Sequence, residues 1–454
     1  MSWPRVGVLA PLRRRNFRLL AVASLTSLLG DGLFRVAIAV QVYAIENDPR
    51  ALAMVAVAWA GAQVLALPAG GWASDRFERR RVMICADLWR AAAVGAIGVL
   101  SVTGDLALWH MYVLGAAFGA GNGFFNPAAT SLVPDLLPDD DLPQANAFLG
   151  VARPGMLWIL GPLAGGFVVS ATEPGAAFLL DAVTFLVSAP LLAAISVRIR
   201  GEITPGGFGQ TLRDIGEGLR FVRRESWAGL WLLAAAISTL AFHGPFDVLV
   251  PYRFKNDLGM NDGQMATAMS LILAAGGAGS ILVSVVIGQR GLPRRFMTVL
   301  YVAETVGVLG IVGLGLMTTR THAMLAGLVI FTMFALSEII WHTTMQRHVP
   351  RGMLGRVSSL DWMASVGLAL ASFAAAGPLG RVYGAEQVLI GAGVAGTVAL
   401  LVIMALPGAR ALENRLPRHV AQAPPEPPGA NFEGLSGGPS VPAHPGSGPP
   451  GLQG

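Results

Sequence analysis

Ionisable side chains inside long apolar runs are the residues of this sequence best placed to do chemistry. Asp31 and Arg35 are four residues apart, which puts them one turn apart on the same face of a helix, and Asp87 and Arg90 are three apart. Arg153 enters another apolar run. A charge inside a bilayer is costly, so each of these groups needs a reason to be there. Two interpretations remain open for the pairs: charge neutralisation within a helix, and proton uptake and release by the carboxylate.

Further acids lie in later apolar runs, namely Asp181, Asp247, Glu304, Glu338 and Asp361. Glu304 and Glu338 have no basic residue within one helical turn in sequence, which favours a titrating role or a distant Arg partner. Asp247 is near the outer end of its run and can simply be hydrated. His243 and His342 can titrate, although polar lining of a cavity is the commoner role for a lone histidine.

Asp31 and Glu338 are the leading candidates for proton coupling, with Arg90 as a charge that changes partners. The full predicted coupling and cavity set is Asp31, Arg35, Arg90, Arg153, Asp247, Glu304 and Glu338.

The composition indicates which elements must position these groups. The chain has 454 residues, of which 54% are hydrophobic and 13% are charged, with a mean hydropathy of +0.59. Soluble domains carry about twice this share of charge, so we expect a polytopic membrane protein. Cys85 is the only cysteine and Lys255 the only lysine, which excludes paired-cysteine metal sites and a P-loop. Catalytic motifs are missing, so we expect neither an enzyme nor a cofactor.

Twelve apolar stretches are long enough to cross a bilayer, and they must be helical because backbone groups in lipid have to bond internally. They cover roughly residues 17–44, 52–72, 83–103, 107–131, 145–170, 174–196, 227–250, 264–287, 296–317, 323–345, 357–380 and 386–406. With the N-terminus inside, 24 basic residues fall in cytoplasmic segments and five in outer loops. This split predicts a multi-pass protein of the cell (plasma or inner) membrane with both termini cytoplasmic.

Landmarks recur at a nearly fixed offset. Val133-Pro134 recurs as Val349-Pro350, and Gly161-Pro162-Leu163 as Gly377-Pro378-Leu379. Asp31 and Asp247, like the paired arginines at 79–80 and 294–295, have the same offset to within one residue. Duplicated halves are common in membrane transporters. The predicted fold is therefore all-α, with twelve transmembrane helices in two pseudo-symmetric six-helix bundles and a substrate path between them.

The repeat also predicts the domain boundaries. We expect an N-terminal bundle over 1–196, a cytoplasmic linker with an amphipathic surface helix over 197–226 and a C-terminal bundle over 227–406. The Pro- and Gly-rich segment 407–454 cannot bury apolar area, so we expect a disordered cytoplasmic tail.

The loop after the second span reads GGWASDRFERRR and contains Gly71, Asp75, Arg76, Arg79 and Arg80. It resembles the G-x-x-x-D-R-x-G-R-R signature of the major facilitator superfamily, except that Glu replaces the second Gly. The resemblance implies that the Asp and Arg residues form gate contacts between the halves, which break during switching. Gly71 is expected to permit close helix approach. A plain positively charged loop is the alternative.

The fifth span contains ILGPLAGG, with Gly161, Pro162, Gly165 and Gly166. It resembles the G-P-x-x-G-G core of the antiporter motif of the same superfamily, and an ordinary kinked helix is the alternative. The strings RRRNFRLLAVASLTSLLGDGLFRVAIAVQVY, ICADLWRA, FFNPAATSLVPDLLP and LRDIGEGLRFVRRE are similar to its enterobactin-exporter and macrolide-efflux branch.

The resulting hypothesis is a monomeric secondary transporter that exports a small amphipathic molecule, such as a drug, macrolide or siderophore, in exchange for protons. Its partners are the substrate, protons and the lipid bilayer; nucleic acid is not expected. Alternatives are uncoupled or uptake facilitation, and a non-transporting membrane sensor on the same scaffold. Acids outnumber bases inside the spans, which favours neutral or cationic cargo, whereas the resemblance to siderophore exporters favours anionic cargo.

Overall fold

The computed structural model describes residues 9–138, 141–196 and 208–415, and in these ranges all regular structure is helical. Residues Met1–Glu413 make one compact unit, and the description below concerns that unit. The predicted tail lies outside the described residues from position 416 onward, and so does the part of the predicted linker at 197–207.

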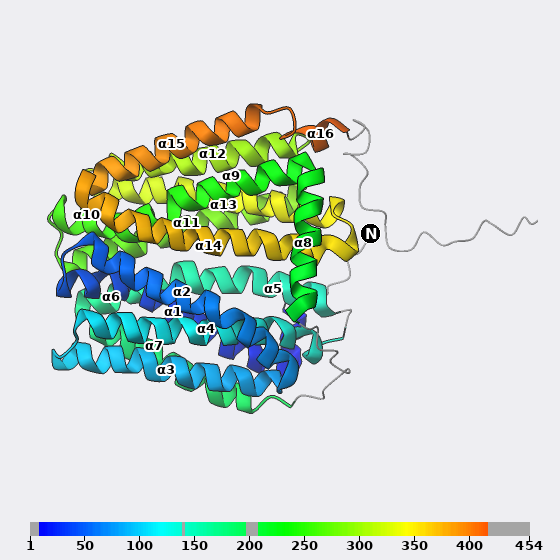
Figure 1. Cartoon of the computed structure of the whole chain (residues 1–454). Helices are drawn as coiled ribbons and strands as arrows, with labels where there is room; N and C mark the ends of the chain where they lie inside the picture. Colours follow the sequence, from blue (N-terminus) through cyan, green and yellow to red (C-terminus); the bar gives the residue numbers. More distant parts are fainter. Residues whose placement is uncertain (1–8, 139–140, 197–207, 416–454) are drawn as a thin grey trace, which may run out of the picture. The chain divides into compact units, whose positions relative to one another are not determined.

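The first half begins with a short helical turn, η1 (Ala10–Arg13), and its spans follow the predicted boundaries closely (Figure 1). They are α1 (Arg15–Ile45), α2 (Pro49–Arg76), α3 (Arg79–Thr103), α4 (Leu108–Leu136), the continuous run α5 (Leu142–Pro154), η3 (Gly155–Leu160) and α6 (Gly161–Ala171), and α7 (Pro174–Ala193).

The second half is built in the same way. Its elements are the continuous run α9 (Ser226–Gly244), η4 (Pro245–Leu249) and α10 (Val250–Asn256), then α11 (Asp262–Arg290), α12 (Phe296–Gly315), α13 (Arg320–His348), α14 (Arg351–Tyr383), α15 (Ala385–Ala405) and the short α16 (Ala411–Arg415). Between the halves, α8 (Phe208–Arg224) lies across the ends of its neighbours α9 and α14 (Figure 1).

Among the described residues, eleven helical runs are long and apolar enough to cross a membrane. The predicted fourth span, α4, has 29 residues but is missing from this set. His110, Asn122 and Asn126 lower its hydropathy, and α4 packs between α2 and α3 in the same bundle. Polar residues of this kind inside a span face protein or water rather than lipid.

Two of the long runs are interrupted by a wider π-helical turn, η3 in the fifth span and η4 in the seventh. Pro154 and Pro162 flank η3, and Pro245 opens η4. Proline lacks the N–H that an α-helix needs, and π-turns are frequently found at functional sites. Asp247, one of the predicted site residues, lies in η4.

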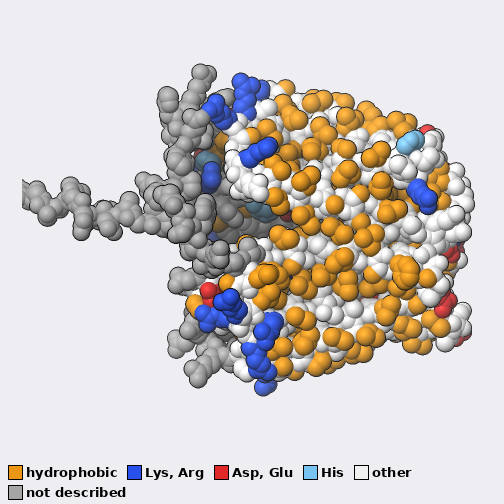
Figure 2. Space-filling model, turned by 180° about the vertical axis from the view of Figure 1, so that it is seen from behind, with side chains coloured by type: hydrophobic (Ala, Val, Ile, Leu, Met, Phe, Trp, Pro, Cys, Tyr) orange, Lys and Arg blue, Asp and Glu red, His pale blue; other side chains and the backbone are white. Residues whose placement is uncertain are grey.

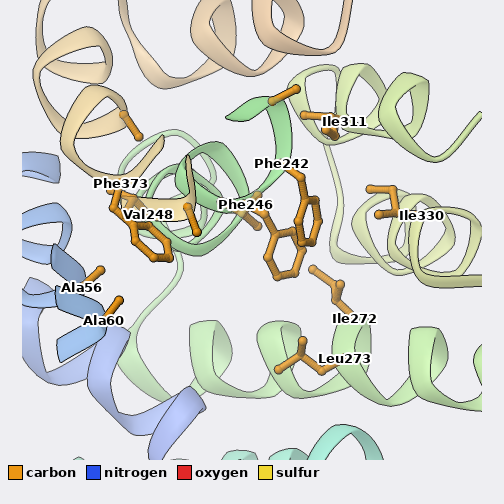
Figure 3. Close-up of a cluster of buried hydrophobic side chains, with 14 of the residues drawn as sticks. Ala56, Ala60, Phe242, Phe246, Val248, Ile272, Leu273, Ile311, Ile330 and Phe373 are labelled. Atoms are coloured by element: carbon orange, nitrogen blue, oxygen red, sulfur yellow. The ribbon is translucent and has the colours of Figure 1, made fainter. Parts of the chain in front are cut away.

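Helices pack mainly within their own half: α1 and α3 on α7 and α2 on α4 in the first, α11 and α12 on α13 and α9 on α14 in the second. The halves meet where α2 packs on α14 and α6 on α11. Figure 3 shows a cluster of buried apolar side chains from both halves, in which Phe242 and Phe246 stack with ring centroids 5.0 Å apart beside Ile272, and Ala56 and Ala60 of α2 contribute from the first half. Such van der Waals packing is what associates helices within lipid.

The surface has the distribution expected of a membrane protein. On the face shown in Figure 2, hydrophobic side chains cover a broad band, and most of the visible Lys and Arg side chains gather at one end of it. We call this the Arg-rich end; it carries the loops that hold Arg76–Arg81 and Arg290–Arg295. The opposite end, where α1 meets α2, is called the closed end for the contacts described next.

The two halves are hydrogen-bonded to each other at the closed end. The Tyr43 hydroxyl donates to the Val248 carbonyl at 2.6 Å, and the Lys255 ammonium donates to the Tyr43 carbonyl at 2.8 Å. The side-chain amides of Asn47 and Asn256 exchange hydrogen bonds, at 2.7 and 3.0 Å. Every one of these contacts joins α1 or the loop after it to η4 or α10.

A second group of closed-end contacts joins α2 to α14. Asp48 caps α2 and pairs with Arg50 at 2.7 Å, while Arg381 lies 3.9 Å from the same carboxylate. Hydrogen bonds from Arg50 hold the pKa of Asp48 below its ordinary value. At Gly377 of α14, an added Cβ would lie 2.8 Å from the Arg50 Cα, so the two backbones nearly touch.

Candidate transport pathway and buried charge cluster

Arg90 of α3 is the centre of a buried charge cluster in the first half. Its guanidinium contacts the carboxylate of Asp87, one turn earlier, and donates to Asn122 Oδ1 of α4 at 2.9 Å. Asp31 of α1 has Oδ2 at 4.0 Å from the same guanidinium. Four of the six helical spans of this half contribute to the cluster once Asp181 of α7 is included. For Asp87 and Arg90, the interpretation as a neutralised pair agrees with this geometry.

Asp181 is fully buried and lies against the backbone of α1, because a Cβ added to Gly30 would overlap its carboxylate. Its one neighbouring hydroxyl is that of Thr184, which donates to the Asp181 carbonyl at 2.7 Å. One carboxylate oxygen each of Asp31, Asp87 and Asp181 has no hydrogen-bond partner among the described residues. The cluster therefore holds three carboxyl groups close to one guanidinium.

Two aromatic rings sandwich that guanidinium. The Arg90 Cζ lies 4.1 Å from the Phe125 ring centroid and 4.3 Å from that of Phe185. These rings exclude water from the Arg90 guanidinium and attract it by cation–π interaction. Because water is excluded, the remaining stabilisation of the guanidinium charge comes from its carboxylate partners.

Arg35 is on the same helix face as Asp31, yet the two do not form the predicted pair. Its guanidinium stacks on Trp158 of η3, at 4.4 Å from the ring centroid, while Asp31 turns toward Arg90. Among the described residues Asp31 and Arg35 form no ion pair, although Arg35 stays within electrostatic range of Asp31; the closer cation is Arg90, on another helix.

Arg35 and Asp247 line one small cavity of about 60 Å³, in which both halves contribute walls. Its other lining residues are apolar or aromatic: Phe34, Ile38, Ala39, Leu52, Ala56, Trp59, Phe246, Met269, Leu273 and Phe373. Asp247 also lies 3.7 Å from His243, one turn earlier. Asp247 therefore lines a cavity between the halves. This position adds to the expectation that it lies near the outer end of its span.

A larger cavity of about 580 Å³ lies nearer the Arg-rich end, between α4 and α5. Arg153 is its charged lining residue; Asn146, Thr130, Leu149 and Val133 are among the others. This volume falls within the range of pockets that hold drug-sized ligands.

The acids of the second half are distributed differently from the prediction. Glu304 is buried and accepts a hydrogen bond from the Ser337 hydroxyl at 2.5 Å, so a serine takes the place of the distant Arg. Glu338 has a 71% exposed side chain and lies 3.7 Å from His342 on the same helix. The expectation that Glu338 lacks a basic neighbour is wrong, because the four-residue spacing to His342 already places an imidazole one turn away.

The predicted gate arginines bind carbonyls and a carboxylate of their own half. Arg79 pairs with Asp135 at 2.5 Å and donates to the Ser131 carbonyl at 3.0 Å, both in α4. Arg80 donates to the Ile195 carbonyl at 2.5 Å, just after α7. Among the contacts of the described residues, neither arginine reaches the second half. The predicted gate between the halves is therefore not formed in this conformation. The contacts at the closed end are formed instead.

Asp75 and Arg76 are exposed at the end of α2. The Arg76 guanidinium lies 5.9 Å from the Trp72 ring centroid, and the ranges described give the Asp75 carboxylate no ion pair. Both side chains are thus available to a partner that approaches from the other half.

The predicted close helix approach at Gly71 is wrong by one residue. A Cβ added at Gly71 would have nothing within 4 Å, whereas one at Gly70 would overlap the Gly123 carbonyl of α4. Successive residues of an α-helix are about 100° apart around its axis, so only Gly70 faces α4.

Comparison with known proteins shows which family the chain belongs to. A family model of the Major Facilitator Superfamily matches residues 20–366. The chain belongs to the Major Facilitator Superfamily. The all-α, polytopic major facilitator fold predicted from the sequence is thereby confirmed, and the chain is a membrane transporter rather than an enzyme.

Individual relatives agree with this assignment. The uncharacterized MFS-type transporter YfiS of Bacillus subtilis is 24% identical over 407 residues, which cover 87% of this chain and 94% of that protein. The enterobactin exporter EntS of Salmonella typhimurium is 27% identical over 358 residues, covering 77% and 81%. The crystal structure of nucleoside transporter NupG has a TM-score of 0.64 at 10% identity, covers 86% of this chain and 98% of its own, and shows a shared fold.

Three helical spans meet at the glycines of the antiporter-like motif, Gly161, Gly165 and Gly166. A Cβ added at Gly161 would lie 2.7 Å from the Gly32 Cα of α1, and one at Gly165 would lie 3.0 Å from the Leu33 Cα. Gly166 faces the other way, against Ser270 of α11 in the second half. Gly161 directly follows η3, so the motif begins where the fifth span changes its helical geometry.

Sequence reasoning left Asp87 and Asp181 out of the predicted site, although both were recognised as acids within spans. Their membership depends on which face of α3 and α7 meets α1, and a helix that is apolar nearly all round does not reveal this. Spacing alone could have found the Glu338 and His342 pair.

Proposed function

We propose that this major facilitator exports small amphipathic molecules, such as drugs, macrolides or siderophores, in exchange for protons. The moving bodies are residues 1–196 and 227–406, joined by the linker 197–226, in a cell membrane with both chain ends on the cytoplasmic side. Its relative EntS is an enterobactin exporter, which supports the direction of transport.

The buried charge cluster is the observation that carries the proposal of proton coupling. Asp87 contacts the guanidinium of Arg90, Asp31 lies 4.0 Å from it, and the fully buried Asp181 is within electrostatic range of it, where water is largely excluded. Ionised carboxylates without a compensating charge are costly in such surroundings, and one of them avoids the cost by holding a proton. The side chain of Asp31, 19% exposed, is the member with contact to the outside of the cluster.

The distribution of contacts between the halves supports alternating access. Hydrogen bonds and close backbone packing join the halves at the closed end, while Arg79 and Arg80 at the Arg-rich end bind within their own half. Exchange to the other state requires that the closed-end contacts break and that the gate residues Asp75, Arg76, Arg79 and Arg80 find partners in the second half. Deprotonation or protonation of Asp31 changes the partners available to Arg90 and so biases this exchange.

Transport in everted vesicles tests the proposal. A macrolide or a catecholate siderophore is added under an imposed pH gradient, and both its uptake and the loss of the gradient are followed. Asp31→Asn and Glu338→Gln are expected to abolish pH-driven uptake with normal protein levels. Asp105→Asn, which changes an exposed loop acid, serves as the control and is expected to transport like the unmodified chain.

Each other outcome has a definite meaning. Equal flux with and without the gradient would indicate an uncoupled facilitator. Unchanged gradient-driven flux in both variants would remove these two residues from the coupling mechanism. Purified protein that moves none of the compounds across liposomes would favour a sensor on the same scaffold.

A further inference from the structure

The charges that line the two cavities do not reflect the excess of acids in the spans, because they are two arginines, Arg35 and Arg153, and one acid, Asp247. Acids outnumber bases within the spans, yet Asp87 and Asp181 have no exposed surface and Glu304 has only 7%. Arg153 lines the large cavity and Arg35 the small one. A count of charges along the sequence therefore does not describe what a bound molecule would meet.

Neither of these two arginines is matched by a carboxylate in the part of the chain that the structure describes. Arg35 is stacked on Trp158, and the nearest acid on its own helix, Asp31, is directed to Arg90. Arg153 has Asp31 within electrostatic range but forms no hydrogen bond or ion pair with it. The one acid in the small-cavity wall, Asp247, has His243 at 3.7 Å.

From this placement we propose that the cargo is an amphipathic organic anion, whose carboxylate or comparable group is received by Arg153 and then by Arg35. This inference rests on the proposed export function and narrows its substrate class. A guanidinium presents a planar fork of donors that fits carboxylate or phosphate oxygens in pairs, and it is not deprotonated in proteins.

The remaining walls account for the apolar part of such a molecule. Val133, Leu142 and Leu149 line the large cavity beside Arg153, and its volume of about 580 Å³ accommodates a drug-sized body. The small cavity of about 60 Å³ accommodates only a terminal group in this conformation, so Arg35 receives the cargo after the halves have moved.

Local electrostatics can be measured without knowing the cargo. The native thiol is removed as Cys85→Ser, and Asn146→Cys then places one thiol in the large cavity, two helical turns from Arg153. Modification rates are compared for an anionic (sulfonatoethyl) and a cationic (trimethylammonioethyl) methanethiosulfonate. Arg153→Gln is expected to lower the anion-to-cation rate ratio at least about five-fold. Arg153→Lys keeps the charge and is expected to keep the ratio, and Arg320→Gln, at the exposed start of α13, is the matched control.

Binding of charge-matched probes completes the test. Purified protein is titrated with 2-naphthoate and with neutral 2-naphthamide. Naphthoate is expected to bind at least about five-fold more tightly, and Arg153→Gln or Arg35→Gln to remove this difference while amide binding is unchanged. The proposal is overturned if the amide binds as well as the acid, if naphthoate does not bind, or if the thiol prefers the cation. Neither assay needs a pH gradient, so a failure of proton-coupled export would leave the modification and binding results intact. Export of a neutral cargo with no preference for anions would overturn the anionic-cargo proposal alone.

Discussion

At the scale of single residues, Arg90 determines the charge balance of the first half. It contacts Asp87 and Asn122, has Asp31 at 4.0 Å and Asp181 within electrostatic range, and lies between two aromatic rings, so its cost in lipid is met by several partners rather than by one. A cation with three carboxyl neighbours can favour one after another at little cost, which a single closed ion pair cannot do. This is the physical basis for assigning Arg90 a part in switching.

Removal of Arg90 should be strongly destabilising. Arg90→Gln removes the cation that contacts Asp87 and lies nearest to Asp31, and breaking a buried pair in this way costs about 3–5 kcal/mol. We expect that much loss in the free energy of unfolding, measured by chemical denaturation in detergent. Adding Asp87→Asn to Arg90→Gln should recover part of the loss, because one unmatched carboxylate is then removed. Losses that simply add in the double variant would contradict the coupling between these residues.

At the scale of helices, small residues decide where the spans touch. Gly70 meets the Gly123 carbonyl of α4, Gly161 meets Gly32 of α1, and Gly166 faces α11 across the boundary between the halves. A side chain at any of these positions would separate two backbones. Gly71, next to Gly70, carries no such constraint.

The neighbouring glycines of α2 provide a matched comparison. Gly70→Ala is expected to destabilise the protein, since the added methyl would overlap a backbone carbonyl that cannot move independently of α4. Gly71→Ala should be neutral or stabilising by up to about 1 kcal/mol, because alanine favours the helix and the site is open. Thermal unfolding in detergent measures both. A larger loss at position 71 than at position 70 would contradict this assignment of the helix faces.

The same scale explains what the sequence could and could not predict. The length and apolar character of each span predicted the helices, and the motif strings predicted the family, as the Major Facilitator Superfamily match confirms. The rotation of a helix about its axis was not predictable, because spans such as α2 and α3 are apolar nearly all round. Gly71 was therefore chosen over Gly70, and Asp181 was left out of the site. Pairing across helices, such as Asp31 with Arg90, depends on that rotation.

At the scale of the whole transporter unit, the halves are joined at one end. Hydrogen bonds of Tyr43 and Asn47 with Val248, Lys255 and Asn256 join the halves at the closed end, while Arg79 and Arg80 bind within their own half at the other. The central claim is that the halves separate at the closed end and meet at the Arg-rich end once in every transport cycle.

A reversible lock on the closed end tests this claim most directly. Asn47 and Asn256, whose amides are 2.7 Å apart, are replaced by cysteine in a Cys85→Ser background, and transport in vesicles is measured before and after oxidation. Oxidation is expected to stop transport and a reducing agent to restore it, while each single-cysteine variant is unaffected by either treatment. Full transport by the oxidised, cross-linked protein would contradict alternating access through the closed end.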